Sequence, residues 1–185
     1  MKALIVIDYT VDFIVGKLPC GQPGIDIEDR MAALTRRFAE AGDFVVMAVD
    51  LHREADVLHP EHKLFPPHNI AGTSGRELYG KLKDAYEANR DRVYWMDKTR
   101  YSAFAGTDLE LQLRMRGIAE LHLIGVCTDI CVLHTAVDAY NRGYRIAVHA
   151  DAVATFNPQG HDWALGHFRH ALGAELLRGG KPIAT

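Results

Sequence analysis

Three side chains suited to nucleophilic chemistry, Asp8, Lys98 and Cys131, each come shortly after a short run of aliphatic and aromatic residues. A thiolate is a strong nucleophile, a carboxylate can take the proton from a thiol, and a nearby ammonium favours the charged forms of both. Taken singly, each residue also has a structural interpretation: a buried small side chain, a capping carboxylate or a solvated lysine. Together the three residues indicate a hydrolase in which Cys131 is the nucleophile and Asp8 its base.

The segment around Cys131 predicts a strand that turns sharply into a helix. The apolar run ending in Val126 is followed by Cys127-Thr128-Asp129-Ile130-Cys131, so Cys131 is expected in the first helical turn. Unpaired N–H groups and the positive end of the helix dipole favour a thiolate there, with a pKa below the ordinary value of about 8.5. If the N–H groups of Cys127 and Cys131 point at one spot, they also form an oxyanion hole.

A second group of residues has the donor atoms of a metal site. Asp50 and His52 end the second apolar run, and alternate residues of an extended segment face the same side. His68 follows in the next loop, and Glu61 offers a further carboxylate. This donor set suits a divalent transition metal. The spacing leaves two other histidines of the loop as alternatives, His59 and His62.

Short apolar runs alternate with helical patterns along the chain. The runs are Ala3–Ile7, Phe44–Val49, Val93–Met96, Leu121–Val126 and Tyr144–Val148. Helices are expected over 27–41, 74–88, 107–116, 128–142 and 160–172, with Ser74 as a possible N-cap of the second and Thr128 or Asp129 capping the fourth. This alternation predicts an α/β fold with a parallel sheet, in which ligands bind at the carboxyl ends of the strands.

Length and composition predict one domain spanning residues 1–185. The chain is 48% hydrophobic with a formal net charge of -3, and no basic patch suggests nucleic acid. The apolar run at the N-terminus is too short for a secretory signal or a membrane span. Three cysteines form no disulfide framework, which favours a cytoplasmic location. The long loop from Asp50 to Thr73 carries hydrophobic residues and prolines, so we expect it to be functional.

These motifs together resemble the isochorismatase-like cysteine hydrolases. The shared pattern is an Asp after the first strand, D-x-H after the second, a Lys after the third, and the G-V-x-T-x-x-C of residues 125–131. Within that superfamily the resemblance is greatest to nicotinamidases. It extends to Ile7-Asp8-Tyr9-Thr10, His59-Pro60-Glu61, residues 63–69, Tyr101-Ser102-Ala103-Phe104 and residues 128–136, and it covers essentially the whole chain.

The resemblance implies a three-layer, doubly wound, mostly parallel six-stranded sheet of order 3-2-1-4-5-6. It implies a triad at Asp8, Lys98 and Cys131, an oxyanion hole from the N–H groups of Cys127 and Cys131, and a cis peptide at Val126–Cys127. It also implies one divalent metal ion, zinc or alternatively iron or manganese, whose ligands match Asp50, His52, His68 and, as a fourth, Glu61. The aromatic residues of the substrate pocket map onto Phe13, Phe65, Tyr101 and Phe104. Cysteine at position 127 departs from the small or aliphatic residue that is usual there.

By this resemblance the protein is expected to be an amidohydrolase that converts nicotinamide to nicotinate and ammonia, and acts on pyrazinamide, through a cysteine thioester in NAD salvage. The expected partners are a small-molecule substrate and further copies of the chain in a homo-oligomer, with no nucleic acid and no membrane. The alternatives are a carbamoylsarcosine or ureidoacrylate amidohydrolase, a metal-activated hydrolase with a structural Cys131, and a non-catalytic binding module on the same fold.

Overall fold

Residues 1–183 contain one seven-stranded sheet at their centre, in the order β3-β2-β1-β4-β5-β6-β7. The computed structural model describes residues 1–183. The strands are β1 (Ala3–Ile7), β2 (Phe44–Asp50), β3 (Val93–Lys98), β4 (Glu120–Val126), β5 (Arg145–Ala154), β6 (Glu175–Arg178) and β7 (Lys181–Pro182). The first six pair in parallel, which confirms the predicted α/β class and strand order. β7 is a short antiparallel addition that was not predicted.

The strands at the centre of the sheet are buried on both faces. All residues of β1 and β2 are buried, and so are Leu121–Val126 of β4. This continuous burial explains why these segments are mainly apolar on both faces and do not alternate between apolar and polar residues. The sheet therefore forms a fixed frame from which the carboxyl ends of neighbouring strands project together.

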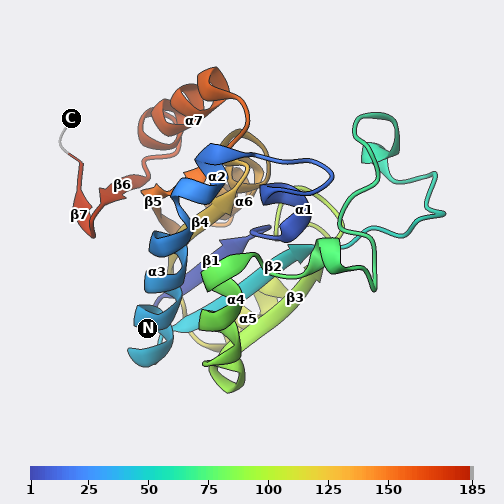
Figure 1. Cartoon of the computed structure of the whole chain (residues 1–185). Helices are drawn as coiled ribbons and strands as arrows, with labels where there is room; N and C mark the ends of the chain where they lie inside the picture. Colours follow the sequence, from blue (N-terminus) through green and yellow to red (C-terminus); the bar gives the residue numbers. More distant parts are fainter. Residues whose placement is uncertain (184–185) are drawn as a thin grey trace.

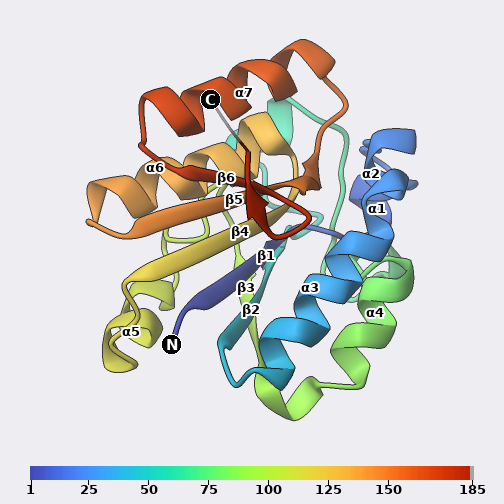
Figure 2. The same ribbon diagram turned by 90° about the vertical axis from the view of Figure 1, so that its left-hand side faces the viewer.

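Helices cover both faces of the sheet and complete the predicted three layers (Figures 1 and 2). The helices are α1 (Val11–Ile14), α2 (Gln22–Asp26), α3 (Glu28–Glu40), α4 (Gly80–Glu87), α5 (Leu109–Met115), α6 (Leu133–Asn141) and α7 (Pro158–His170). α3 and α4 pack in one hydrophobic cluster with one face of β1 and β2. α5, α6 and α7 pack in a second cluster on the opposite face. The periodic residues Met31, Leu34 and Phe38 of α3 are buried, as their spacing predicts.

Several short elements differ from the sequence-based expectation. α1 and α2 were not predicted, because helices of four and five residues are too short to show a period. The helix expected from Ser74 begins at Gly80 instead, and Ser74–Arg76 forms a separate 3-10 turn without a side-chain cap. β5 continues to Ala154, because a bulge in its pairing with β4 lets Val153 and Ala154 rejoin the sheet.

The loop after β2 projects from the body of the molecule (Figure 1). It contains one 3-10 helix, η1 (Pro60–Lys63), and returns to the sheet through His68 and Asn69, which are buried. Two backbone hydrogen bonds hold its ends together: His52 N–H donates to the Asn69 carbonyl (3.1 Å) and Ala71 N–H donates to the His52 carbonyl (2.9 Å). Within residues 1–183, no helix combines the length and apolar character needed to cross a membrane.

Candidate active site

The sheet topology brings the candidate residues to one edge. Asp8 directly follows β1, Asp50 ends β2, Lys98 ends β3, and Cys131 lies in the turn after β4. These four strands are neighbours in the sheet and run in parallel, so their carboxyl ends lie side by side. All four side chains are buried, with exposed fractions between 0 and 6%. Residues as far apart in sequence as positions 8 and 131 therefore share one buried site.

Lys98 lies between the other candidate residues. Its Nζ is 2.7 Å from Asp8 Oδ2, 3.5 Å from Asp50 Oδ1 and 3.8 Å from Cys131 Sγ, and it donates to the Arg100 carbonyl at 3.1 Å. Asp8 also accepts the N–H of Asp50 through Oδ1 (2.8 Å). Its backbone has a positive φ of 55°, in the left-handed region where aspartate is more common than most residues. Two carboxylates and a thiol thus share one ammonium.

The charges of this group follow from burial and from Lys98. Burial lowers the pKa of Lys98, but Asp50 and Asp8 outweigh it and hold that pKa well above its usual range. Burial raises the pKa of Asp8 to about 6, against the opposing effect of Lys98. Burial also raises the pKa of Cys131 well above its usual range; Lys98 opposes this and Asp8 reinforces it. The resting site therefore holds a thiol beside a carboxylate and an ammonium at neutral pH, and the expected low pKa of Cys131 is not found.

The turn that carries Cys131 is more unusual than a capped helix. The Val126–Cys127 peptide is cis, as the resemblance implies, and Thr128–Val132 forms a π-helical turn before α6. The expected cap at Thr128 or Asp129 was wrong: Cys127 is the N-cap and no side chain caps the turn. The Thr128 hydroxyl instead pairs with His161 Nδ1 at 2.9 Å. The Cys127 carbonyl accepts the N–H groups of both Ile130 and Val132 at 3.1 Å, which holds the turn in place.

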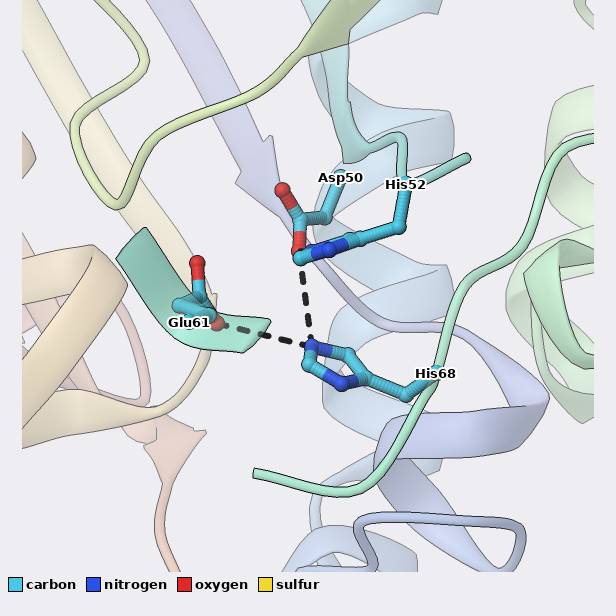
Figure 3. Close-up of side chains that lie close together, drawn as sticks. All are labelled: Asp50, His52, Glu61 and His68. Atoms are coloured by element: carbon cyan, nitrogen blue, oxygen red, sulfur yellow. Dashed lines mark hydrogen bonds and ion pairs between the residues drawn. The ribbon is translucent and has the colours of Figure 1, made fainter. Parts of the chain in front are cut away.

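Four potential metal ligands form a buried cluster next to this group (Figure 3). They are Asp50, His52, Glu61 and His68, and one ligand atom from each lies within 4.8 Å of the others. His52 Nε2 is 2.6 Å from Asp50 Oδ2. His68 Nε2 lies 3.7 Å from Asp50 Oδ2 and 3.6 Å from Glu61 Oε2. The projecting loop after β2 thus supplies Glu61 and His68 to the end of β2.

The chemistry of the cluster fits a divalent cation. His68 Nδ1 pairs with the Pro66 carbonyl (2.8 Å), which directs Nε2 toward the two carboxylates (Figure 3). That Nε2 is buried and has no hydrogen-bond partner among the described residues. A buried polar atom without a partner is costly, and a cation bound between the imidazole nitrogen and the carboxylates would remove that cost. Two imidazoles with two carboxylates are ligands that zinc, iron and manganese accept.

The two competing histidines of the loop lie outside this cluster. His59 Nε2 pairs with the Thr99 carbonyl (2.7 Å), and His59 Nδ1 accepts the N–H of Glu61 (3.2 Å). Both ring nitrogens of His59 are therefore occupied, and one of these bonds positions Glu61. His62 is exposed. Sequence spacing left these alternatives open, because it does not reveal how the loop folds back.

Aromatic side chains surround His68. Phe13 is buried and meets the His68 ring edge to face, with ring centroids 5.0 Å apart. Phe65 approaches the same ring at 6.3 Å. A cavity of about 160 Å³ lies here, lined by His52, Phe65 and His68 among others. Phe13 is not among the residues that line this cavity, so its assignment to a substrate pocket stays a prediction, as does that of Phe65.

Tyr101 and Phe104 lie on the segment after β3. Burial raises the pKa of Tyr101 to about 12, with Glu61 and Cys131 adding to the effect, so its hydroxyl is neutral and close to the site. Phe104 has a different environment, since its ring packs 5.8 Å from Tyr144 and under the guanidinium of Arg142. Phe104 therefore also belongs to the core, and its assignment to a substrate pocket stays a prediction.

Sequence reasoning missed two residues that hold the site. Arg76, in the 3-10 turn Ser74–Arg76, donates to the carbonyls of Asp50 (2.7 Å) and Val49 (3.2 Å) and pairs with Asp97. It secures the end of β2, but nothing in its sequence context distinguishes it from a surface arginine. The second missed residue is Asn69. Its position directly after His68 is the feature of the sequence that could have identified it.

Comparison with known proteins places this geometry in a family. The model of the isochorismatase domain matches residues 2–179. The chain belongs to the isochorismatase family. It is 63% identical over 179 residues to the uncharacterized isochorismatase family protein PncA of Bacillus subtilis, covering 95% of this chain and 98% of that protein.

Solved structures of family members have the same fold. The crystal structure of nicotinamidase/pyrazinamidase PncA from Bacillus subtilis superimposes with a TM-score of 0.93 at 61% identity, covering 95% of this chain and 99% of that one. The pyrazinamidase of Pyrococcus horikoshii, solved in complex with zinc, superimposes with a TM-score of 0.85 at 29% identity, covering 96% of this chain and 98% of that one. The isochorismatase-family fold is therefore confirmed, and the protein is a hydrolase with nicotinamidases among its structural neighbours.

Proposed function

We propose that this protein is a nicotinamidase, which hydrolyses nicotinamide to nicotinate and ammonia and acts on pyrazinamide in the same way. The observation that carries the proposal is the buried Asp8–Lys98–Cys131 group directly beside the cluster of Asp50, His52, Glu61 and His68. A non-catalytic binding module would not need a nucleophile, a base and a cation in one buried place. The similarity to proteins named as nicotinamidases and pyrazinamidases supports the same substrate class.

The first half of the reaction forms a thioester. Asp8 takes the proton of the Cys131 thiol, and the thiolate attacks the carboxamide carbon. The N–H groups of Cys127 and Cys131 stabilise the oxyanion, an effect worth about 3–4 kcal/mol per donor in other enzymes. Asp8 then protonates the amine, the C–N bond breaks and ammonia leaves. Because burial raises the pKa of Cys131 well above its usual range, we expect the thiol to give its proton to Asp8 as the sulfur attacks.

The second half of the reaction releases the acid. Asp8 takes a proton from a water molecule, and the resulting hydroxide attacks the thioester carbon. Collapse of the tetrahedral species breaks the C–S bond, frees the carboxylic acid and returns the proton from Asp8 to the sulfur. Lys98 remains an ammonium throughout and keeps both carboxylates of the site near a positive charge. The chain thus supplies every proton-transfer group that the reaction needs.

Asp50, His52, His68 and Glu61 would hold the metal ion, for which zinc is the first candidate and iron and manganese are alternatives. When bound, this ion would orient the substrate by ligating its ring nitrogen, directly or through a water molecule. Phe13, Phe65 and Tyr101 would then flank the ring. A linear ureido substrate would gain less from aromatic walls, which favours a heteroaromatic amide over carbamoylsarcosine or ureidoacrylate.

Ammonia release from a panel of amides tests the proposal. The panel contains nicotinamide, pyrazinamide, carbamoylsarcosine and ureidoacrylate, each assayed with the metal-loaded protein. We expect turnover of the two heteroaromatic amides and little of the linear ones. Turnover of a linear amide without turnover of nicotinamide would assign the protein to another amidohydrolase of the family, and no turnover at all would favour a binding module. A role in NAD salvage, a single functional domain, a cytoplasmic location and a homo-oligomeric state stay predictions.

A further inference from the structure

Asn69 connects three segments that meet at the site, although it bears none of the chemistry. Its side chain is fully buried, and its backbone has a φ of 46°, in the left-handed region where asparagine is tolerated better than most residues. It directly follows His68 at the point where the projecting loop rejoins the sheet. Its neighbours in space come from the segments after β1 and after β2.

The carbonyl, the N–H group and Oδ1 of Asn69 have partners on the segments after β1 and after β2, and only the side-chain Nδ2 has none among the described residues. Its carbonyl accepts the N–H of His52 (3.1 Å), and its own N–H donates to Asp12 Oδ2 (2.8 Å). Its Oδ1 accepts the hydroxyl of Thr10 at 2.8 Å, and Thr10 lies two residues beyond Asp8. Asn69 thus links two places in the cluster to the segment after β1. One is the backbone of His52, and the other is the chain position next to His68.

A purely conformational role does not explain the side chain. Glycine adopts positive φ without strain and would keep both backbone hydrogen bonds. Asparagine instead buries Nδ2 without a hydrogen-bond partner among the described residues, which has a cost in stability that glycine would avoid. The bond from the Thr10 hydroxyl to Oδ1 is the one specific contact that the side chain provides in return.

We propose that Asn69 is a positioning residue. Its hydrogen bond with Thr10 fixes His52 and His68 relative to Asp8, so that the metal cluster and the nucleophile group keep a constant relative position. This inference rests on the proposed metal site and names the residue that holds its two histidines in place. Groups that orient metal ligands from behind commonly change metal affinity by 10- to 100-fold when they are removed. Asn69 acts on the backbone around the ligands, so we expect roughly a 10-fold effect.

The zinc affinity of the metal-stripped protein tests this inference, measured by competition with a chromogenic chelator and without any activity assay. Asn69→Gly removes the side chain and keeps the backbone conformation, and Thr10→Val removes only the hydroxyl. Each should weaken zinc binding roughly 10-fold. The double variant should bind zinc no more weakly than the weaker-binding single variant, because both changes delete the same hydrogen bond. Thr10→Ser keeps the hydroxyl and should bind zinc as the wild type does.

Two controls separate positioning from loss of folding. Asn141→Gly makes the same replacement at an exposed residue at the end of α6 and should leave zinc affinity unchanged. Thermal unfolding of the metal-free variants shows whether the folded state persists, and Thr10→Val provides the test if Asn69→Gly does not fold. Zinc affinities of both variants within twofold of wild type would overturn the inference and leave the proposed function standing. Failure of the wild-type chain to bind zinc, iron(II) or manganese(II) would overturn the inference together with the metal site on which it rests.

Discussion

At the scale of single residues, the site depends on one buried cation. Lys98 Nζ lies within 3.5 Å of a carboxylate oxygen of both Asp8 and Asp50, and within 3.8 Å of the Cys131 sulfur. Removing one partner of a buried ion pair leaves an uncompensated charge, which costs far more than breaking a surface pair. Lys98 therefore contributes to folding as well as to the proposed chemistry.

Lys98→Met should lower the free energy of unfolding by about 3–5 kcal/mol, because two buried carboxylates would then face each other without a cation. Urea denaturation at pH 7 measures this loss. Lys83→Met is the matched control, since Lys83 pairs with Glu77 on the surface and each side chain is about half exposed, so its loss should stay below about 1 kcal/mol. Equal stability of the two variants would contradict the assigned role of Lys98.

The positions of the catalytic candidates could be predicted from sequence, but the protonation state of Cys131 could not. Asp8 directly follows β1 and Lys98 ends β3, and parallel strands bring such ends together. Burial raises the pKa of Cys131, Lys98 opposes this and Asp8 reinforces it, and a local helix-dipole argument contains none of these effects. The local argument predicted a thiolate, whereas burial in the three-dimensional site favours the thiol.

At the scale of elements, long periodic segments were predictable and short ones were not. α3 shows its buried face in the spacing of apolar residues, whereas α1 has only four residues and owes its place to tertiary contacts such as the bond from Val11 N–H to the Glu77 carbonyl. The choice of Glu61 over His59 in the candidate metal cluster depends on the path of the loop after β2. That path has no periodicity and is fixed by individual hydrogen bonds.

β4 and β5 carry a pair of buried histidines that the proposed reaction does not use. His122 Nδ1 and His149 Nε2 are 2.9 Å apart, beneath the ring of Phe38 from α3. Burial lowers the pKa of His149 to about 3; the charges of His122, Arg30 and Arg37 add to this, and Asp151 opposes it. The pKa of His122 is also lowered, again mainly by burial and despite its bond to Glu120. Both rings are therefore neutral in the folded protein at pH 7.

The His149 pair predicts an acid-sensitive stability. The folded-state pKa lies below the unfolded value of about 6.5, so the unfolded chain takes up a proton first as the pH falls. The neutral ring therefore makes its full contribution to the free energy of unfolding above about pH 6.5, and this contribution is lost as the pH falls toward 3. For His149 the loss between pH 7 and pH 5 is roughly 2 kcal/mol. Urea unfolding at both pH values should show a smaller loss for His149→Gln than for the wild type. An equal loss in the two proteins would show that His149 does not resist protonation.

At the scale of the whole molecule, the fold places a projecting loop over the carboxyl ends of a parallel sheet (Figure 1). The sheet supplies Asp8, Asp50 and Lys98 from rigid strand ends, and the loop supplies Glu61 and His68. The fold class and strand order followed from the alternation of strands and helices together with the family resemblance. The seventh strand did not, because a two-residue antiparallel addition leaves no pattern in the sequence.

Removal of divalent metal should affect substrate binding and global stability together. In the proposed function the ion positions the ring, so a verified metal-free sample should show a raised KM for nicotinamide. Adding zinc back at about 100 times its dissociation constant should raise the free energy of unfolding by about 2.7 kcal/mol, because the ion binds only the folded cluster. Unchanged KM and an unchanged melting temperature in the metal-free protein would remove the metal from the proposal.

The central claim, that Cys131 is the nucleophile of a nicotinamidase, is tested most directly by the kcat of ammonia release from nicotinamide in Cys131→Ala. Cys127→Ala is a matched control, because it makes the same replacement in the same buried turn and keeps the backbone N–H group on which the mechanism relies. We predict that Cys131→Ala loses at least about a thousandfold in kcat, since deleting a covalent nucleophile costs about a millionfold in other hydrolases. Cys127→Ala should stay within about tenfold of the wild type. Persistence of most nicotinamide hydrolysis in Cys131→Ala would contradict the account.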